Sequence, residues 1–383
     1  MTMAKTYGVG IMGAGNISSA YLRLAPLFKG IEVRGVADIL PAAAKKRADE
    51  FNVPAMTPDE MLKNSEIDVV VNLTIPAAHY RVSTDIISAG KHAYSEKPFV
   101  LSVKEGKALK KEADKRGLYV GSAPDTFLGG AHQQVRDIID SGKLGKIMSG
   151  TTHVMSRGME HWHPNPVFFF QPGAGPVLDI GPYYVTDLIQ LLGPVARVSA
   201  FANMARKSRI ISTPNVELTG KKFKVETPTT IHGIMEFDSG AIVTIGASWD
   251  VASHGHHNIE LYGTEGSVYV PDPNFFGGDI VTTDITGVKT KVEPWDHPFG
   301  KTNQTSPDGS NARANYRTAG LADMIQSIEK KKPARCGIDV ALHAVDVMTS
   351  LLKAGETGKV VALSTTCKRP KALKPADAAA LLK

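Results

Sequence analysis

The feature that most constrains the fold is an apolar run that becomes a glycine turn and then a helix, over residues 7–27. Residues 7–12 have the composition of a buried strand, and apolar residues recur at helical spacing after the turn. Gly13 permits a tight turn, and Gly15 lets the backbone approach a pyrophosphate. The N–H groups at the start of the helix then face the phosphates. We therefore predict a strand–turn–helix unit that binds a dinucleotide.

A carboxylate stands where the ribose of such a dinucleotide requires one. Residues 31–38 have the pattern of a second strand that ends in Asp38, at 38 − 15 = 23 positions beyond Gly15. An acid about 20 residues beyond the turn accepts a hydrogen bond from the ribose 2′-hydroxyl and repels a 2′-phosphate. Ile39 and Leu40 follow, with no adjacent Arg or Lys. The sequence therefore predicts NAD rather than NADP as the cofactor.

The pattern of strands and helices changes along the chain. Strands and helices alternate over the first ~125 residues, as in a doubly wound parallel sheet. Later strands are joined by hairpin turns at 238–240 and 263–266, which predicts a mostly antiparallel sheet. We predict an α/β fold with an N-terminal Rossmann domain at 1–128 and a C-terminal α+β domain at 129–383, which carries a large open sheet. The last two helices are expected at about 314–330 and 340–354.

Composition excludes several classes of protein. No stretch approaches 18 unbroken apolar residues, so we predict no membrane span. Cys336 and Cys367 lack the spacing of a disulfide framework or a cysteine metal site. Met1 to Thr6 has no export signal, so the cytoplasm is the expected compartment.

The net charge of +6 does not predict a nucleic-acid partner. Lysines of residues 103–116 lie on one helical face, which indicates a solvated surface. The basic tail 368–371 is short, and we expect it to pack poorly.

Several motifs along the chain belong together: the glycine turn, Asp38, the Glu96-Lys97-Pro98 tripeptide and the segments 173–183 and 341–348. In these motifs the chain resembles a known family, the Gfo/Idh/MocA oxidoreductases. The resemblance implies a cis Lys97–Pro98 bond and a lysine directed at the nicotinamide ribose and the substrate hydroxyl. The residues agree, because ligands in such sheets bind beyond the carboxyl ends of the strands, where Lys97 stands. An ammonium group there would stabilise a developing alkoxide.

A second motif departs from the family pattern at one position. The family's Asp-x-Gly-x-His motif is matched by Asp179 and Gly181, but Tyr183 stands in place of histidine. Some relatives resemble this chain in having tyrosine there. Free tyrosine has a pKa of ~10, and a nearby ammonium such as that of Lys97 would favour the phenolate. We therefore predict Lys97, Asp179 and Tyr183 as catalytic residues, with Tyr183 as the base.

Further residues are predicted to bind cofactor or substrate. The loop 159–166 mixes hydrogen-bonding and aromatic groups, a combination that suits sugars. Candidates for substrate binding are Lys97, Asp125, His153, Arg157, Trp162, His163, Asp179 and Tyr183. Candidates for cofactor binding are Gly13, Gly15, Asn16, Ile17, Asp38, Asn72, Thr74, Pro76, His79, Glu96 and Lys97. The histidine pairs at 161–163 and 254–257 lack a third ligand at characteristic spacing, so no metal site is predicted.

These inferences leave three functions open. The first is an NAD-dependent dehydrogenase that acts on a secondary alcohol of a sugar, sugar derivative or cyclitol. The second is an NAD-dependent glycosidase that oxidises its substrate transiently and then eliminates the aglycone. The third is a non-catalytic NAD-binding regulator, which would have no need of the Lys97–Asp179 pair. The resemblance also implies a homodimer or homotetramer assembled through the open sheet, and a small-molecule substrate rather than a nucleic-acid or membrane partner.

Overall fold

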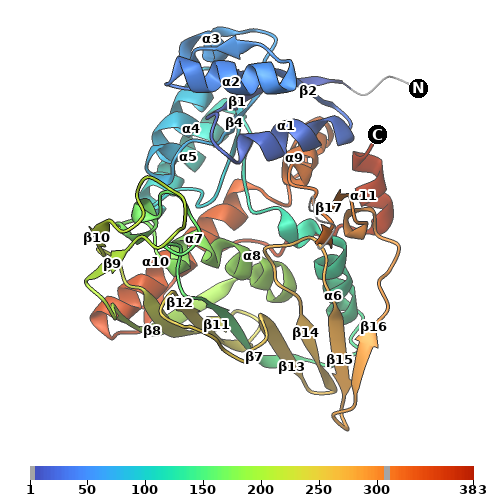
Figure 1. The fold of residues 1–383 in the computed structure, drawn as a ribbon. Helices are drawn as coiled ribbons and strands as arrows, with labels where there is room; N and C mark the ends of the chain where they lie inside the picture. Colours follow the sequence, from blue (N-terminus) through green and yellow to red (C-terminus); the bar gives the residue numbers. More distant parts are fainter. Residues whose placement is uncertain (1–4, 306–310) are drawn as a thin grey trace. The chain divides into compact units, whose positions relative to one another are not determined.

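The structure is a computed structural model that describes residues 5–305 and 311–383 (Figure 1). The chain forms two compact units, and each is built from segments that are distant in sequence. Unit 1 comprises Met1–Gln133, Trp295–Leu342 and Pro370–Lys383, and unit 2 comprises Gln134–Pro294 and His343–Arg369. The predicted division at residue 128 falls near the first boundary between the units, which follows Gln133. The predicted C-terminal domain, however, includes segments that belong to unit 1.

Unit 1 contains a six-stranded sheet of order β3-β2-β1-β4-β5-β6, which we call the parallel sheet. Every neighbouring pair is parallel, as the alternating pattern predicts. The central strands β1 and β4 are buried along their whole length, which explains their continuous apolar sequences. The strands are β1 Tyr7–Met12, β2 Ile31–Ala37, β3 Ala55–Met56, β4 Val69–Asn72, β5 His92–Ser95 and β6 Val120–Ser122.

Helices of unit 1 begin where the sequence supplies caps. Thr57 and Glu60 form a capping box at the start of α3, and Ser102 caps α5. The helices are α1 Ser18–Leu24, α2 Pro41–Phe51, α3 Pro58–Lys63, α4 His79–Ser88, α5 Val103–Arg116, α9 Ala319–Lys330 and α11 Pro375–Leu381. Helices α6 Gly130–Asp140 and α10 Ile338–Thr357 each contain a boundary between the units.

Hydrogen bonds join the C-terminal segments of unit 1 to the parallel sheet and to one another. The Ser122 N–H in β6 donates to the Cys336 carbonyl at 2.9 Å. The His297 Nε2 lies 3.0 Å from the carbonyl of Leu373, which is buried.

The prediction that 368–371 packs poorly is wrong, because Pro370 is buried and the Arg369 guanidinium pairs with Asp140 at 2.8 Å. Periodicity cannot reveal such contacts, since they join residues far apart in sequence.

Unit 2 contains a nine-stranded sheet of order β16-β15-β14-β13-β7-β12-β11-β8-β19, which we call the large sheet. Its pairs are antiparallel except β12 with β7, so the predicted character is confirmed. The strands are β7 Ile147–Met155, β8 Val195–Asn203, β11 Thr230–Phe237, β12 Ile242–Ser248, β13 Ile259–Gly263, β14 Gly266–Val270, β15 Ile280–Asp284, β16 Lys289–Val292 and β19 Val361–Ala362.

The two faces of the large sheet differ. Helices α8 (Gly181–Leu192) and α10 lie over one face (Figure 1), where a Cβ on Gly233 would come within 2.8 Å of Leu351. The other face, which we call the outer face, exposes Phe201, His232 and Ile234. Successive side chains of a strand alternate between faces, so the register decides which residues are exposed.

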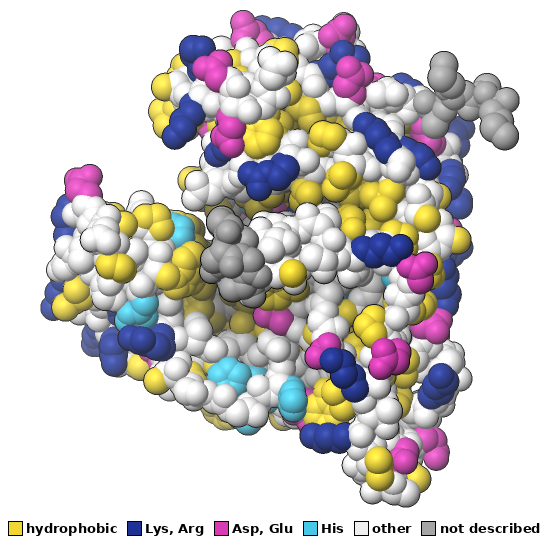
Figure 2. All heavy atoms as spheres, turned by 45° about the vertical axis from the view of Figure 1, so that its right-hand side comes forward, with side chains coloured by type: hydrophobic (Ala, Val, Ile, Leu, Met, Phe, Trp, Pro, Cys, Tyr) yellow, Lys and Arg dark blue, Asp and Glu magenta, His cyan; other side chains and the backbone are white. Residues whose placement is uncertain are grey.

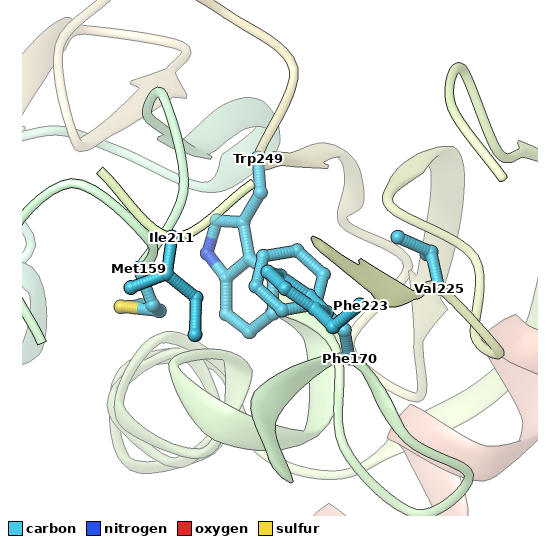
Figure 3. Close-up of a cluster of buried hydrophobic side chains, with 6 residues drawn as sticks. All are labelled: Met159, Phe170, Ile211, Phe223, Val225 and Trp249. Carbon is cyan, nitrogen blue, oxygen red and sulfur yellow. The ribbon is translucent and has the colours of Figure 1, made fainter. Parts of the chain in front are cut away.

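A short hairpin that the sequence did not predict covers part of unit 2. Strands β9 (Ser208–Ile210) and β10 (Lys222–Lys224) pair antiparallel, and we call them the β9–β10 hairpin. Its apolar side chains meet the segments around residues 159, 170 and 249 in a buried cluster. Figure 3 shows the Trp249 indole between Ile211 on one side and Phe223 on the other.

Candidate active site

The predicted cofactor residues lie at the carboxyl ends of four adjacent strands, β2, β1, β4 and β5. At the end of β1, Gly13 has φ +108°, and a Cβ there would lie 2.6 Å from the Leu73 carbonyl. Glycine is therefore required by both conformation and space. A Cβ on Gly15 would meet nothing within 4 Å, and Gly15 and Asn16 are exposed. The turn thus offers an open backbone to a ligand before α1, where Ile17 is the N-cap.

Asp38 is fixed against this turn. Its Oδ2 accepts the Ala14 N–H at 2.8 Å and its Oδ1 accepts the Leu40 N–H at 2.9 Å. Each carboxylate oxygen has a further lone pair, so both can still accept a ribose hydroxyl. The open turn and the half-buried carboxylate fit NAD. Sequence reasoning missed Arg47 of α2, whose Nη2 donates to the Gly15 carbonyl at 3.1 Å.

The end of β4 is a closed hydrogen-bond network. The Asn72 Nδ2 donates to the His79 carbonyl and the Ser83 hydroxyl, both at 3.0 Å, and the Thr74 hydroxyl donates to its Oδ1 at 2.6 Å. The buried His79 ring faces the Pro98 and Thr74 carbonyls at 2.7 and 2.9 Å. Burial lowers the pKa of His79 below its usual value. Asn72 and His79 therefore shape the loop of Thr74 and Pro76, and a direct bond of the His79 ring to the cofactor has no structural support.

The Glu96-Lys97-Pro98 segment follows β5 and contains a cis Lys97–Pro98 peptide bond, as the resemblance implies. The Tyr21 hydroxyl of α1 donates to Glu96 Oε1 at 2.9 Å, and the Lys97 N–H donates to Glu96 Oε2 at 3.0 Å. Burial, reinforced by Glu96, holds the pKa of Tyr21 well above its usual value. Tyr21 thus ties the glycine-turn helix to the half-buried Lys97. In the sequence, Tyr21 appears only as one apolar position of a helix.

The second motif lies in unit 2, at the junction of α7 (Pro176–Asp179) and α8. Asp179 and Tyr183 are both half-buried. The adjacent Tyr184 is buried, donates to Asp272 at 3.2 Å and accepts from Asn258 at 2.8 Å. Burial raises the pKa of Tyr184 above its usual value. Of the two tyrosines, Tyr184 packs in the interior, while Tyr183 keeps part of its surface exposed.

Asp125 has a structural role in unit 1. It is buried, and its Oδ2 accepts the N–H groups of Thr318 and Gly320 at 2.9 and 3.0 Å, at the start of α9. Burial raises the pKa of Asp125, and the two backbone donors oppose that shift. Because the Asp125 side chain is only 2% exposed and is bonded to the start of α9, the predicted substrate contact has no structural support.

The structure also separates His153 from Asp179 and Tyr183. His153 lies on the outer face of the large sheet, where its ring stacks on His256 with centroids 3.9 Å apart. Figure 2 shows histidine side chains, in cyan, at separate places on the left and lower parts of the visible face. Burial and the neighbouring histidines lower the pKa of His153 to about 4. The predicted substrate contact is therefore not supported, because the sheet lies between His153 and the helices that carry the motif.

The loop with Trp162 and His163 is held by a buried ion network. The Arg209 guanidinium, on β9, donates to Glu160 Oε1 at 2.5 Å, to Asp250 and to the Trp249 carbonyl at 2.9 Å. Asp250 also accepts the Thr229 and Thr230 hydroxyls. Arg157, predicted to bind substrate, is exposed, and its carbonyl accepts from Arg209 at 3.2 Å. No sequence signal identifies this network, because its charges come from distant segments.

Within 5–305 and 311–383, no group of three or more His, Cys, Asp or Glu side chains has the arrangement of a metal site. Over the same residues, no helix has the length and apolar character required to cross a bilayer.

Comparison with known proteins gives matches over most of the chain. Residues 7–123 match the family model described as "Oxidoreductase family, NAD-binding Rossmann fold", and residues 132–269 match the GFO/IDH/MocA C-terminal domain. An inositol 2-dehydrogenase/D-chiro-inositol 3-dehydrogenase of Lactiplantibacillus plantarum is 31% identical over 157 residues, which are 38% of this chain and 43% of the relative. The scyllo-inositol 2-dehydrogenase (NAD(+)) of Bacillus subtilis is 25% identical over 264 residues, which are 68% of this chain and 72% of the relative.

The matched segments span about two fifths of the length of several curated relatives. Among solved structures, an NAD-binding oxidoreductase from Klebsiella pneumoniae has a TM-score of 0.79 at 20% identity, covering 94% of this chain and all of that one. At this level of identity the structural likeness establishes the fold.

Proposed function

The chain belongs to the Gfo/Idh/MocA family of oxidoreductases, and we propose that it is an NAD-dependent enzyme that transfers hydride between nicotinamide and a secondary alcohol. The proposed substrate is a sugar, sugar derivative or cyclitol, because curated relatives are named for inositols. The observation that carries the proposal is Lys97, held beyond the end of β5 by the Tyr21–Glu96 bond. A lysine at this edge is suited to polarise an alcohol beside a cofactor bound at the glycine turn.

Each residue has a defined task in the proposed reaction. Asp38 would accept hydrogen bonds from the ribose hydroxyls, and the glycine turn would accommodate the pyrophosphate. Tyr183 accepts the proton of the substrate hydroxyl, Lys97 stabilises the developing negative charge on its oxygen, and Asp179 orients the reacting groups. When bound, NAD would supply the redox chemistry as the hydride acceptor.

The test is a screen of sugars, inositols and anhydrosugars with NAD and with NADP, read as NADH or NADPH absorbance. Replacing Tyr183 with Phe should lower kcat at least ~100-fold and leave NAD binding intact, since general acid–base catalysis contributes this much. Tyr269→Phe removes the hydroxyl of another half-buried tyrosine, on β14, and is the matched control. Equal turnover in Tyr183→Phe and wild type would remove Tyr183 from the mechanism.

The same screen separates the other two functions. Cleavage of a glycoside without accumulation of NADH would identify a glycosidase that returns the hydride to its substrate. NAD binding without turnover of any compound would indicate a regulator.

We also propose that the protein forms a homodimer or homotetramer through the outer face of the large sheet. Phe201, Ile234 and Ile242 are 78%, 47% and 48% exposed there, and burial against a second copy would remove this apolar surface from water. Light scattering of wild type and Phe201→Asp measures the effect. A monomeric wild type would contradict the proposal.

A further inference from the structure

We propose that an exposed aromatic surface in unit 2 binds a second sugar ring, joined to the ring that is oxidised. This surface consists of Trp162, His163, Phe168 and Phe169, and we call it the aromatic platform. The preferred substrate is then a disaccharide or another glycoside with two rings, rather than a single-ring sugar. The inference rests on the proposed function and specifies the substrate class of the same site.

The rings of the platform contact one another in a continuous array. The His163 ring meets Trp162, Phe168 and Phe169 edge-on, with centroids 5.4, 5.6 and 5.0 Å apart. Phe168 and Phe169 lie 4.0 Å apart at 30°. Trp162 is 62% exposed and Phe168 44% exposed. Exposure of such side chains forfeits about 1.5–3 kcal/mol each relative to burial, so a grouped pair of them indicates a surface that a ligand covers.

Buried residues of unit 2 hold the platform in place. The Thr213 hydroxyl donates to the His163 carbonyl at 2.8 Å, and the Phe169 ring meets Trp249 edge-on at 6.1 Å. The Arg209–Glu160 pair fixes the start of the loop, and both side chains are 3% exposed. Exposed rings on a fixed base lose little conformational freedom when a ligand binds. Incidental exposure at a loop tip would have no such support.

The platform adjoins the segment that carries Asp179 and Tyr183. Ile180, between those two residues, packs against the same buried cluster as Phe169. The Gly175 N–H donates to the Phe169 carbonyl at 2.9 Å, which joins the platform to the start of α7. A ring attached to the reacting ring would therefore lie over the aromatic surface.

The chemistry of the platform fits a sugar ring. A pyranose presents an apolar C–H face, which packs on aromatic rings, and hydroxyls at its edge, which need polar partners. The His163 Nδ1 accepts the Asn165 N–H at 3.1 Å, so the neutral ring carries its proton on Nε2 as a hydrogen-bond donor. A protein partner fits less well, because a specific interface buries about 1,200 Å² or more. The strongly exposed rings of the platform are Trp162 and Phe168, and two rings offer much less surface than such an interface.

The first experiment compares matched substrates with the holoenzyme and NAD. Each aldose is paired with its methyl glycoside and with a disaccharide that contains it, and initial rates give kcat and KM. In wild type we expect kcat/KM for the two-ring compound to exceed that of the single ring at least tenfold. Phe168→Ala should lower this ratio about tenfold by raising KM for the two-ring compound. Ile285→Ala removes an apolar side chain that is 72% exposed, directly after β15 in unit 2, and should leave the ratio unchanged.

The second experiment measures binding without turnover. Fluorescence titration of wild type with the same sugars should show tighter binding of the two-ring compound. Trp162→Ala should remove the signal, and Phe168→Ala, which keeps Trp162, should remove the preference. Equal kcat/KM for one and two rings, or equal affinity in the titration, would overturn the inference and leave the proposed oxidation intact. A change of oligomeric state in Phe168→Ala, seen by light scattering, would also overturn it, because the surface would then face a second copy. Absence of turnover with every sugar counts against the proposed function, and the titration still decides the inference.

Discussion

The edge of unit 1 that is proposed to bind the cofactor and the loop 159–166 of unit 2 that is proposed to bind substrate are built in opposite ways. At the glycine turn, the backbone itself forms the proposed site: Gly13 and Gly15 occupy positions set by one strand–turn–helix unit, and Asp38, at the end of β2, is bonded to the turn through the Ala14 N–H. In the loop, side chains form the support, and the Arg209 guanidinium joins Glu160 to Asp250 across segments of different origin. A backbone site tolerates few residue types at each position. A side-chain network instead fails when any one charge is left unpaired.

The largest effect should come from breaking the ion network. Arg209→Met leaves the buried carboxylate of Glu160 and the partly buried carboxylate of Asp250 without their cation, which should cost about 3–5 kcal/mol of unfolding free energy. Chemical denaturation measures the loss. Arg206→Met, at an exposed neighbouring position, is the control and should change stability by less than ~0.5 kcal/mol. If both variants have the stability of wild type, the network does not hold the loop.

Two glycine substitutions should separate folding from cofactor binding in unit 1. Gly13→Ala places a Cβ against the Leu73 backbone at a positive φ, so we expect a loss of about 1–3 kcal/mol in stability together with weaker NAD binding. Gly15→Ala places its Cβ in open space, so stability should stay unchanged while NAD affinity falls about tenfold, or ~1.4 kcal/mol. Thermal denaturation and calorimetric titration measure the two quantities.

Gly255→Ala is the matched control, because a Cβ there also meets nothing within 4 Å. It should alter neither stability nor NAD affinity. Unchanged NAD affinity in Gly15→Ala would show that the dinucleotide does not approach the turn closely.

The smallest effect concerns pH. The pKa of His153 is lowered to about 4 by burial and by His256, His232 and His254, whereas an unfolded histidine titrates near 6.5. Between these values the unfolded state binds more protons, so this contribution to stability is present above pH 6.5 and is lost as pH falls toward 4. His153→Asn should make the decline of stability over this range shallower, by a fraction of a proton per unfolding event.

Unfolding free energies at several pH values test this expectation. His257→Asn, on the same segment as His256, serves as control. A slope that His153→Asn leaves unaltered would contradict the assignment of a lowered pKa.

Motifs identified by sequence differ in how much of their environment they reveal. Glu96-Lys97-Pro98 was recognisable as a short string, and its cis bond agrees with the resemblance. Tyr21, which donates to Glu96 at 2.9 Å, was not recognisable, because it lies on helix α1, 75 residues before Glu96 in the chain. His153 and Asp125 are instructive for the same reason. Each is a polar residue that the sequence offers as a candidate for substrate binding, yet the strand register places His153 against His256 and the start of α9 donates to Asp125.

The amino-acid sequence by itself determined the parallel sheet, the mostly antiparallel large sheet, the glycine turn and the family, since these depend on local periodicity and short motifs. The tertiary structure decided the membership of the two units, the β9–β10 hairpin and the network around Arg209. Those features depend on contacts between residues far apart in the chain, and local patterns of hydrophobicity carry no record of such partners.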